Sequence, residues 1–354
     1  MKALVAMSGG VDSSVAAALM LEAGHEVVGV TLKQWVGADG RLPTAGCCTV
    51  ADAEDARRVA ARLGVPHYVL DQVEEFTAQV VDRFVAGYLE GRTPNPCIEC
   101  NRRVRFGVLL DRVAALGCDV LVTGHYARIG ERDGHPALLA GIDPTKDQSY
   151  VLHMLSASDL PRVRFPIGGL TKVEVRQHAT RLGLRTAAKP DSQDLCFVAG
   201  DYRSFLRERS GEADRPGEIV DVDGSVLGQH DGVSGFTVGQ RKGLGVAVGA
   251  PRFVLGVDPA TATVRVGRRS DLAVDSCTVT GVSFVSGPVS DGSSVLVKVR
   301  YRSRSVAARL YPGADGWRVE FAEAQESVAP GQSAVFYRDD EVLGGGTIAT
   351  TEAA

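Results

Sequence analysis

The motif S-G-G-V-D-S-S at residues 8–14 combines residue types that hold a phosphate group. Gly9 and Gly10 let the backbone approach an anion closely, and serines on either side add hydroxyl donors. The motif follows an apolar run, residues 3–7, and opens an alanine-rich helical pattern, so a helix start would aim free N–H groups at the anion. This order predicts a phosphate site. The lysine of a Walker A loop is missing, and the simpler alternative is a helix that Asp12 or Ser13 caps.

Two cysteines, Cys97 and Cys100, form a C-x-x-C motif at the predicted start of a helix. Prolines on both sides of Asn95 stiffen the loop that precedes them. A helix N-terminus lowers the pKa of a thiol, and the arginines at positions 102, 103 and 105 add positive potential. We therefore expect Cys100 to have thiolate character.

A third thiol, Cys196, follows the polar segment K-P-D-S-Q-D-L at residues 189–195. A lone cysteine of this kind can also be a small buried hydrophobe. Cys118 and Cys277 lie in apolar, strand-like settings and are predicted to be structural, whereas the pair at positions 47 and 48 is ambiguous.

The first 126 residues alternate between apolar strand-like runs and helical patterns. The expected strands are residues 3–7, 27–32, 67–70 and 120–123, and the expected helices are residues 15–23, 52–63, 75–89 and 101–116. This alternation predicts an α/β fold with a doubly wound parallel sheet, whose ligands bind at the carboxyl ends of the strands. The end T-G-H-Y at residues 123–126 should face the same crevice as the phosphate motif. His125 has the alternative role of a hydrogen-bonded histidine that closes a strand.

The second half of the chain changes character. Helix-like segments at 172–182 and 201–209 are followed, from about residue 216, by short alternating runs with Gly and Asp turns, which predict strands of a small barrel or sandwich. We place domain boundaries near residues 203 and 269. The predicted domains are 1–203, 204–268 and 269–354, with residues 350–354 as a loose tail.

Composition limits the classes of protein. The chain has 354 residues, a net charge of −4 and no apolar run long enough to cross a membrane. Its start lacks the layout of a signal peptide, and seven cysteines argue against a secreted disulfide framework. We expect a soluble, cytoplasmic protein with no membrane partner.

A series of motifs, distributed along the whole chain, resembles one family. They are S-G-G-V-D-S-S (8–14), R-T-P-N-P-x-x-x-C-N (92–101), T-G-H-Y (123–126), K-D-Q-S-Y (146–150), C-F (196–197), G-Q-R-K-G-L-G (239–245), R-Y (300–301) and P-G-Q-S-A-V-F-Y (330–337). Together they resemble the tRNA-specific 2-thiouridylases of the MnmA/TrmU type, which belong to the PP-loop ATP pyrophosphatases. The resemblance implies a PP-loop domain of the HUP-like kind, a small central domain that contacts tRNA and a C-terminal antiparallel β-barrel. It also implies 2-thiolation of the wobble uridine of tRNA.

The resemblance further implies the chemistry. ATP with Mg²⁺ would adenylate the uracil 2-oxygen and release pyrophosphate, with Asp12 as a candidate ligand of Mg²⁺. Cys196 would carry a persulfide supplied by a donor protein, and Cys100 would act as the nucleophile that closes a Cys100–Cys196 disulfide. The ATP-binding residues would be Ala6, Met7, Ser8, Gly9, Gly10, Val11, Asp12, Ser13, Ser14, Leu32 and Gly124.

The anticodon loop of tRNA is the implied partner, with its target base flipped out of the stack. Expected contacts to the base and the tRNA are Asn95, Pro96, Cys97, His125, Lys146, Asp147, Gln148, Arg300, Tyr301 and Gln332. Further arginines and lysines at 102–105, 162–164, 241–242, 268–269 and 300–304 could line one face, although charged groups are more often just a solvated surface. Cys97 departs from the family pattern, which has an aspartate there, so the role of a general base is vacant or altered.

Other readings of the same residues stay open. Cys97, Cys100 and Cys196 could hold a [4Fe–4S] cluster with one open iron, whereas a zinc site would want a fourth ligand. A PP-loop ligase or amidotransferase for a small metabolite would use the same loop but needs neither three loop cysteines nor a basic barrel. A non-enzymatic RNA-binding or sulfur-carrier module is disfavoured by the intact motif at 8–14.

Overall fold

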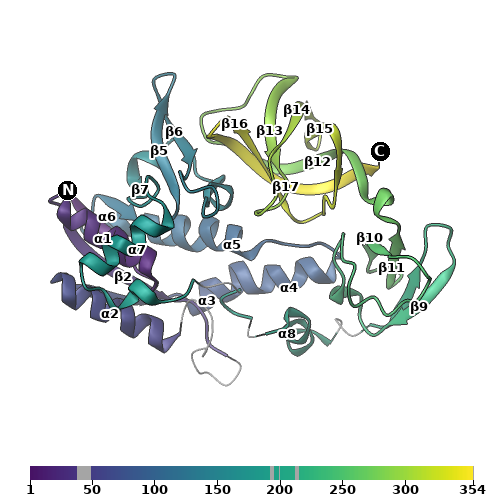
Figure 1. Ribbon diagram of the computed structural model, residues 1–354, viewed down its shortest axis with the longest axis horizontal. Helices are drawn as coiled ribbons and strands as arrows, with labels where there is room; N and C mark the ends of the chain where they lie inside the picture. The colour runs from purple at the N-terminus through teal and green to yellow at the C-terminus, as the bar shows by residue number, and fades with distance from the viewer. Residues whose placement is uncertain (38–48, 192–194, 199, 212–214, 354) are drawn as a thin grey trace. The chain divides into compact units, whose positions relative to one another are not determined.

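The computed structural model describes residues 1–37, 49–191, 195–198, 200–211 and 215–353 (Figure 1). Cys47, Cys48 and residues 192–194 lie outside the described residues. Contacts divide the chain into two units. Unit 1 comprises Met1–Val81, Pro96–Ala199 and Asp340–Leu343, and unit 2 comprises Asp82–Asn95, Gly200–Asp339 and Gly344–Ala354. The three-domain division at 203 and 269 stays a prediction.

Unit 1 is built on a parallel sheet with the strand order β3-β2-β1-β4-β7. The strands are β1 (Lys2–Ala6), β2 (Glu26–Lys33), β3 (His67–Asp71), β4 (Val120–Val122) and β7 (Val163–Arg164). Each neighbouring pair runs parallel. The four predicted strands are confirmed. The short edge strand β7 was not predicted, because two residues carry no readable period.

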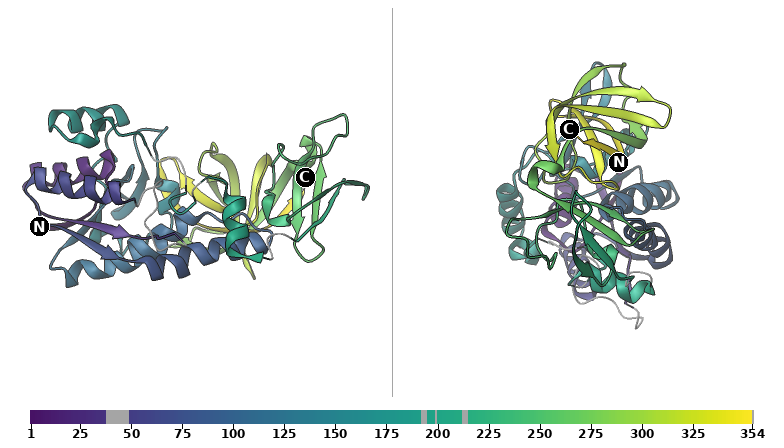
Figure 2. Two further views of the ribbon diagram at one scale, coloured as in Figure 1. Left: turned by 90° about the horizontal axis from the view of Figure 1, so that it is seen from below. Right: turned by 90° about the vertical axis from the view of Figure 1, so that its right-hand side faces the viewer.

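Helices cover both faces of this sheet (Figure 2). On one face, α1 (Val11–Glu22), α2 (Val50–Leu63) and α7 (Lys172–Arg181) pack into a core with the strands. Small side chains such as Ala16 and Ala17 are fully buried there and let α1 approach the sheet closely. The opposite face is covered by a helical run made of α5 (Pro96–Glu99), the π-helical η2 (Cys100–Leu109) and α6 (Leu110–Ala115). The doubly wound α/β fold is confirmed.

Other elements of unit 1 were only partly foreseen. The predicted helix 75–89 is α3 (Val73–Phe76), the π-helical η1 (Thr77–Val81) and, in unit 2, α4 (Asp82–Leu89). A hairpin, β5 (Ala127–Arg132) and β6 (His135–Ala140), turns at Asp133 and Gly134, which both have positive φ. The 3-10 helices are η3 (Ser149–Leu152), η4 (Leu160–Arg162) and η5 (Arg185–Ala188).

Unit 2 contains a four-stranded sheet and a barrel. The small sheet has the order β10-β11-β8-β9, and its core includes Ile219, Val254 and Val264. Its elements are β8 (Gly217–Val220), β9 (Val226–His230), β10 (Phe253–Asp258) and β11 (Thr263–Gly267), with α8 (Tyr202–Arg209), η7 (Val233–Gly235) and η8 (Arg269–Leu272) beside them in the chain.

The barrel closes through a pairing between its first and last strands. Its strands are β12 (Ala273–Phe284), β13 (Ser293–Lys298), β14 (Val306–Gly313), β15 (Gly316–Glu326), β16 (Ser333–Arg338) and β17 (Glu341–Ala353). The antiparallel barrel is confirmed, but the loose tail at 350–354 is wrong as far as residue 353. Thr350 pairs with Thr278 and Ala353 with Val274, because closure gives the backbone of this end a partner. Among the described residues, no helix has the length and apolar character that a membrane crossing requires.

Candidate active site

The phosphate motif joins β1 to α1 as predicted. Gly10 is the N-cap of α1, while Asp12 and Ser13 lie inside its first turn. A glycine cap has no side chain to offer the first N–H groups of the helix, which keeps them available for an anion. The alternative of a helix capped by Asp12 or Ser13 does not fit this arrangement.

Hydroxyl groups brace the loop. The backbone N–H of Ser8 donates to Ser13 Oγ at 3.1 Å, and Ser14 Oγ donates to the Gly10 carbonyl at 2.8 Å. Gly9 has φ +73°, and a Cβ atom there would lie 2.1 Å from the Asp52 carbonyl oxygen. Only glycine fits at this position, so the turn holds its shape through both conformation and packing.

The end of β4 lies against this loop. A Cβ atom on Gly124 would lie 2.6 Å from the backbone nitrogen of Ser13. The end of β4 therefore lies beside the motif, but the side chains of Thr123, His125 and Tyr126 are buried, so a shared crevice stays a prediction. Tyr126 adds a second link, because its hydroxyl donates to Asp12 Oδ1 at 2.8 Å.

A lysine reaches the phosphate loop from far along the sequence. Lys172, the first residue of α7, places Nζ 2.8 and 2.9 Å from the two carboxylate oxygens of Asp12. The same Nζ lies 2.8 Å from Asp191 Oδ1. The loop has no Walker lysine of its own, but the ammonium group of Lys172 lies beside it.

The predicted C-x-x-C helix start is confirmed. Cys97 lies in α5 and is exposed, whereas Cys100 begins η2 and is 7 % exposed. The amide Nε2 of Gln34 donates to Cys100 Sγ at 3.3 Å.

Cys196 is held through its neighbour. Phe197 is buried, and its ring packs edge-on against Trp35 and Phe76, with centroids 6.2 and 5.8 Å away. Trp35 directly follows Gln34. In this dipeptide Gln34 contacts Cys100, and Trp35 contacts Phe197, the neighbour of Cys196. This dipeptide directly follows β2. Because β2 runs parallel to β1, it ends at the edge of the sheet where the phosphate loop follows β1. The structure thus brings thiols 96 positions apart in the sequence to one region of unit 1.

A polar chain links the cysteine helix to the end of β4. Asn101 Oδ1 accepts from Arg105 Nη1 at 3.2 Å, and the same Nη1 lies 3.4 Å from His125 Nε2. His125 Nδ1 lies 2.7 Å from Thr123 Oγ1. Burial, with a smaller effect of Arg105, lowers the pKa of His125 to about 3, so this imidazole is neutral. The alternative role of a strand-closing histidine matches these contacts.

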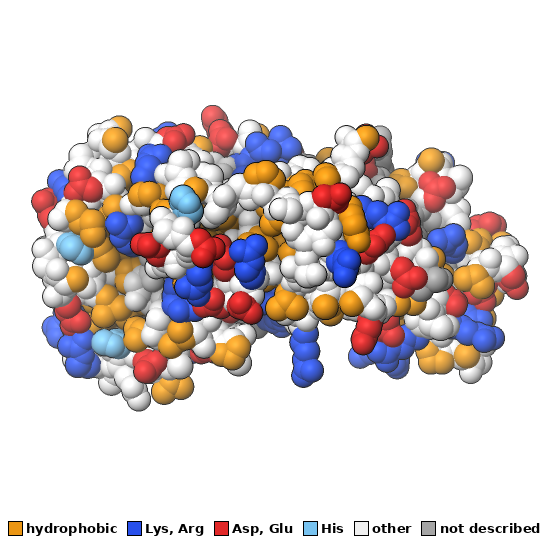
Figure 3. Space-filling view, turned by 90° about the horizontal axis from the view of Figure 1, so that it is seen from above, with side chains coloured by type: hydrophobic (Ala, Val, Ile, Leu, Met, Phe, Trp, Pro, Cys, Tyr) orange, Lys and Arg blue, Asp and Glu red, His pale blue; other side chains and the backbone are white. Residues whose placement is uncertain are grey.

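Several expected tRNA contacts already have partners within their own unit. In unit 1, Lys146 binds Asp191 at 2.7 Å, Asp147 Oδ1 accepts from Gly141 N, and Gln148 Oε1 accepts from Tyr126 N. In unit 2, Arg300 donates to the Val238 carbonyl, Gln332 donates to the Thr93 carbonyl, and Tyr301 is 37 % exposed. On the face drawn in Figure 3, Lys and Arg side chains lie among Asp and Glu.

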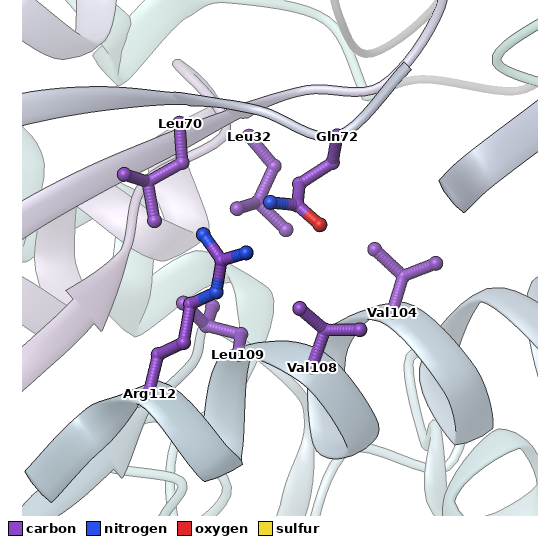
Figure 4. Close-up of a pocket in the computed structure, with 7 residues that line it drawn as sticks. All are labelled: Leu32, Leu70, Gln72, Val104, Val108, Leu109 and Arg112. Carbon is purple, nitrogen blue, oxygen red and sulfur yellow. The ribbon is translucent and has the colours of Figure 1, made fainter. Parts of the chain in front are cut away.

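The side chain of Leu32 lines a small hollow on the η2 face of the sheet, which has no room for a water molecule (Figure 4). The other lining residues are Leu70, Gln72, Val104, Val108, Leu109 and Arg112. The Arg112 guanidinium and the Gln72 amide point inward among the aliphatic side chains. A contact of Leu32 with adenosine would therefore use its backbone.

The three cysteines do not form a metal centre in this structure. Among the described residues, which include Cys97, Cys100 and Cys196, no group of three or more His, Cys, Asp or Glu side chains could hold a metal ion. Cys97 is exposed and Cys100 is buried, and we derive no step through a [4Fe–4S] cluster.

The parallel sheet and its lysine-free phosphate loop define an α/β enzyme of the PP-loop class. The family models that match are described as a tRNA methyl transferase HUP domain over residues 1–200, a tRNA methyl transferase PRC-barrel domain over 203–268 and an aminomethyltransferase beta-barrel domain over 274–348. The chain belongs to the family of tRNA-specific 2-thiouridylases, which are tRNA sulfurtransferases.

The relatives match over their whole length. The tRNA-specific 2-thiouridylase MnmA of Chloroflexus aurantiacus (strain ATCC 29366 / DSM 635 / J-10-fl) is 49 % identical over 356 residues, covering 99 % of both chains. The MnmA of Geobacter metallireducens is 49 % identical over 98 % of this chain and 96 % of its own. A solved 4-thiouridine synthetase–RNA complex with bound ATP is 19 % identical, with a TM-score of 0.37 over 60 % of this chain and 50 % of that chain. That structural likeness is too weak to carry an argument.

Sequence reasoning missed Gln34, Trp35, Lys172 and Asp191. Gln34 and Trp35 follow a predicted strand end, which was a usable signal because ligands gather there. The sequence around Lys172 and Asp191 gives no indication that these side chains contact each other or the phosphate loop.

Proposed function

We propose that this protein uses ATP to replace the 2-oxygen of the wobble uridine of tRNA by sulfur, with a persulfide on Cys196 as the sulfur carrier. The observation that carries the proposal is the Gln34-Trp35 dipeptide, which contacts Cys100 and the neighbour of Cys196 at the sheet edge that holds the phosphate loop. A small-metabolite ligase would have no use for two thiols at this place.

The first step activates the base. The uracil 2-oxygen attacks the α-phosphorus of ATP and displaces pyrophosphate, so the poor leaving oxygen becomes part of AMP. Residues 6–14 would bind the phosphates, and Leu32 and Gly124 would adjoin the adenosine. Mg²⁺ that arrives with ATP would reduce the negative charge of the phosphates. Asp12 is bound to Lys172 and Tyr126, so it would have to exchange Lys172 to contact that ion.

The second step transfers sulfur. The terminal sulfur of the Cys196 persulfide attacks C2 of the adenylated base, the C2–O bond breaks, and AMP leaves with the oxygen. The Cys100 thiolate then attacks Cys196 Sγ and breaks the S–S bond, which leaves sulfur on C2 and forms a Cys100–Cys196 disulfide. A reductant with two electrons reopens this disulfide. A persulfide donor protein then reloads Cys196.

The flipped base would lie beside Asn95, Pro96 and Cys97. Cys97 stands where the family pattern has an aspartate, and its exposed thiol takes that place here. Lys146, Asp147, Gln148 and His125 of unit 1 and Arg300, Tyr301 and Gln332 of unit 2 are the remaining candidates for tRNA contact. Because Cys97 is exposed, its thiol is accessible to a base that lies beside it.

The nucleotide products test the proposal. With ATP labelled at its α- or γ-phosphate, we expect AMP and pyrophosphate, formed only when tRNA is present. Asp12→Ala and Ser13→Ala should abolish thiolation and leave tRNA binding intact, because both residues lie in the first turn of α1. ADP and phosphate as the coupled products would overturn the PP-loop mechanism, and loss of tRNA binding in a folded variant would show that the nucleotide site is misplaced.

Anaerobic purification decides between sulfur carriers. The persulfide route predicts protein without stoichiometric iron and acid-labile sulfide that still thiolates tRNA when a persulfide donor is supplied. Activity that requires bound iron and labile sulfide would favour a [4Fe–4S] cluster on Cys97, Cys100 and Cys196 instead.

A further inference from the structure

Asp191 is bound by three cations in unit 1. Its Oδ2 lies 2.7 Å from Lys146 Nζ, and its Oδ1 lies 2.8 Å from Lys172 Nζ and 3.1 Å from Arg176 Nη2. Burial works to raise the pKa of Asp191, but hydrogen bonds from Lys146 and Lys172 outweigh it and lower the pKa to about 2. The carboxylate is therefore charged at every pH at which the enzyme would work.

The three cations connect Asp191 to three different parts of unit 1. Lys172 also binds Asp12 in the phosphate loop, and its side chain is only 11 % exposed. Lys146 is a candidate tRNA contact. Arg176 donates to the carbonyls of Ala187 and Lys189, so it fixes the backbone that leads to Asp191.

Asp191 lies five positions before Cys196 in the sequence. The other side of Pro190 is tied to the phosphate loop as well, since Lys189 Nζ donates to the Gly9 carbonyl at 3.0 Å. Lys189 also contacts Asp52 and Asp55, each at 2.7 Å. Residues 189–191 are thus anchored to the nucleotide loop on both sides of Pro190, whose fixed φ limits the freedom of this backbone.

We propose that Asp191 is a positioning residue that couples the phosphate loop to the Cys196 segment, so that sulfur is delivered where the adenylated base is held. Asp191 touches neither ATP nor sulfur; it acts through Lys172 and through the backbone that it anchors. Phosphate charge at the loop competes with Asp12 for Lys172, and Arg176 and Lys146 keep Asp191 in place while Lys172 responds. This inference rests on the proposed function, because it assumes adenylation at the loop and persulfide on Cys196.

The test is the ratio of pyrophosphate released to 2-thiouridine formed, measured with full-length protein, tRNA, ATP and a persulfide donor. Asp191→Asn keeps the shape of the side chain and removes its charge. We expect thiouridine formation to fall by about 100-fold, the effect of a misplacement of about 1 Å, while pyrophosphate release changes far less. The ratio should therefore rise, and Asp191→Glu should restore part of the coupling.

Asp340→Asn is the matched control, since Asp340 also binds two cations, Arg128 at 2.6 Å and Arg132 at 2.8 Å, within unit 1. Its ratio should equal that of the unmodified protein. If Asp191→Asn fails to fold, Arg176→Lys tests the inference instead. It keeps the positive charge but loses the guanidinium group that donates to the carbonyls of Ala187 and Lys189. That variant should show a smaller rise in the ratio.

An unchanged ratio in a folded Asp191→Asn or Arg176→Lys protein would overturn the inference, even if both products fell together. Failure of the proposed function would look different, because the unmodified protein would then release no pyrophosphate with tRNA or would form thiouridine without Cys196.

Discussion

Cys100 and Cys277 are both buried, at 7 % and 1 % exposure, but their surroundings differ. Cys100 starts the π-helical η2 in unit 1, where Gln34 donates an N–H to its sulfur. Cys277 lies in β12 of the barrel, and burial raises its pKa to about 12. Burial alone therefore does not decide whether a thiol reacts. Cys100 has a hydrogen-bond donor from a distant strand end beside its sulfur, and we expect that donor to matter for its reactivity.

The same contrast extends to the regions around the two thiols. The cysteine helix of unit 1 makes polar contacts over long sequence distances, from Gln34 to Cys100 and from Asn101 to the Val151 carbonyl. The barrel has antiparallel strand pairing interrupted by β-bulges, and buried apolar side chains such as Val279 and Leu310. The polar long-range contacts described for the cysteine helix thus have no counterpart around Cys277, whose surroundings are apolar.

The largest expected effect is the loss of tRNA thiolation when a cysteine of unit 1 is replaced, in contrast to a cysteine of the barrel. Cys100→Ser and Cys196→Ser should each lower 2-thiouridine formation by about a thousandfold or more, as loss of a nucleophile does in other enzymes. Cys277→Ser and Cys118→Ser should remain active if folded, because burial raises the pKa of both thiols. Mass spectrometry of digested tRNA measures the product. Full activity of Cys196→Ser in a single turnover with a sulfide donor would show that no persulfide is obligatory there.

The second effect is on the stability of the barrel at alkaline pH. Folded Cys277 keeps its proton above its ordinary pKa of 9.0, whereas the unfolded chain loses it. The free energy of unfolding should be unaffected below pH 9 and should then fall by about 1.4 kcal/mol per pH unit until about pH 12. Urea unfolding followed by Trp317 fluorescence, in a Trp35→Phe background, measures the barrel transition. Cys277→Val should lose this component of the pH dependence, and an equal slope in both proteins would refute the assignment.

A smaller effect should follow from loss of the donor at Cys100. Gln34→Ala removes an N–H group from the sulfur, and loss of a hydrogen bond to a charged group should slow alkylation of Cys100 at neutral pH about tenfold. Peptide-resolved mass spectrometry after iodoacetamide treatment distinguishes Cys100 from the exposed Cys97. Gln72→Ala, a buried glutamine that lines the hollow instead, is the control. Equal alkylation rates in both variants would mean that Gln34 does not tune the thiol.

The smallest effect tests the barrel as a tRNA-positioning surface. Arg300→Ala with Arg304→Ala should weaken tRNA binding and flatten its salt slope by about one unit for each phosphate that the protein no longer neutralises. ATP affinity should hardly change. Arg318→Ala, on β15 and paired with Glu320 and Glu352, is the matched control and should keep the full slope. An unchanged slope in the double variant would remove these two residues from the proposed interface.

The sequence alone determined the local features of this protein. The phosphate loop could be predicted because a strand, a glycine turn and a helix start are set by neighbouring residues. The parallel strands and most barrel strands followed from apolar periods, and the C-x-x-C helix start followed from its prolines. These preferences act over a few residues, so a single segment reveals them.

Only the tertiary structure decided the partners of those features. Lys172 binds Asp12 across 160 positions and Gln34 binds Cys100 across 66, and no local pattern connects either pair. The barrel end at 350–353 became a strand because β12 offered it hydrogen bonds, and β7 exists as the neighbour of β4. Side-chain partners and edge strands depend on which surfaces the packed core brings together, and that choice belongs to the whole chain.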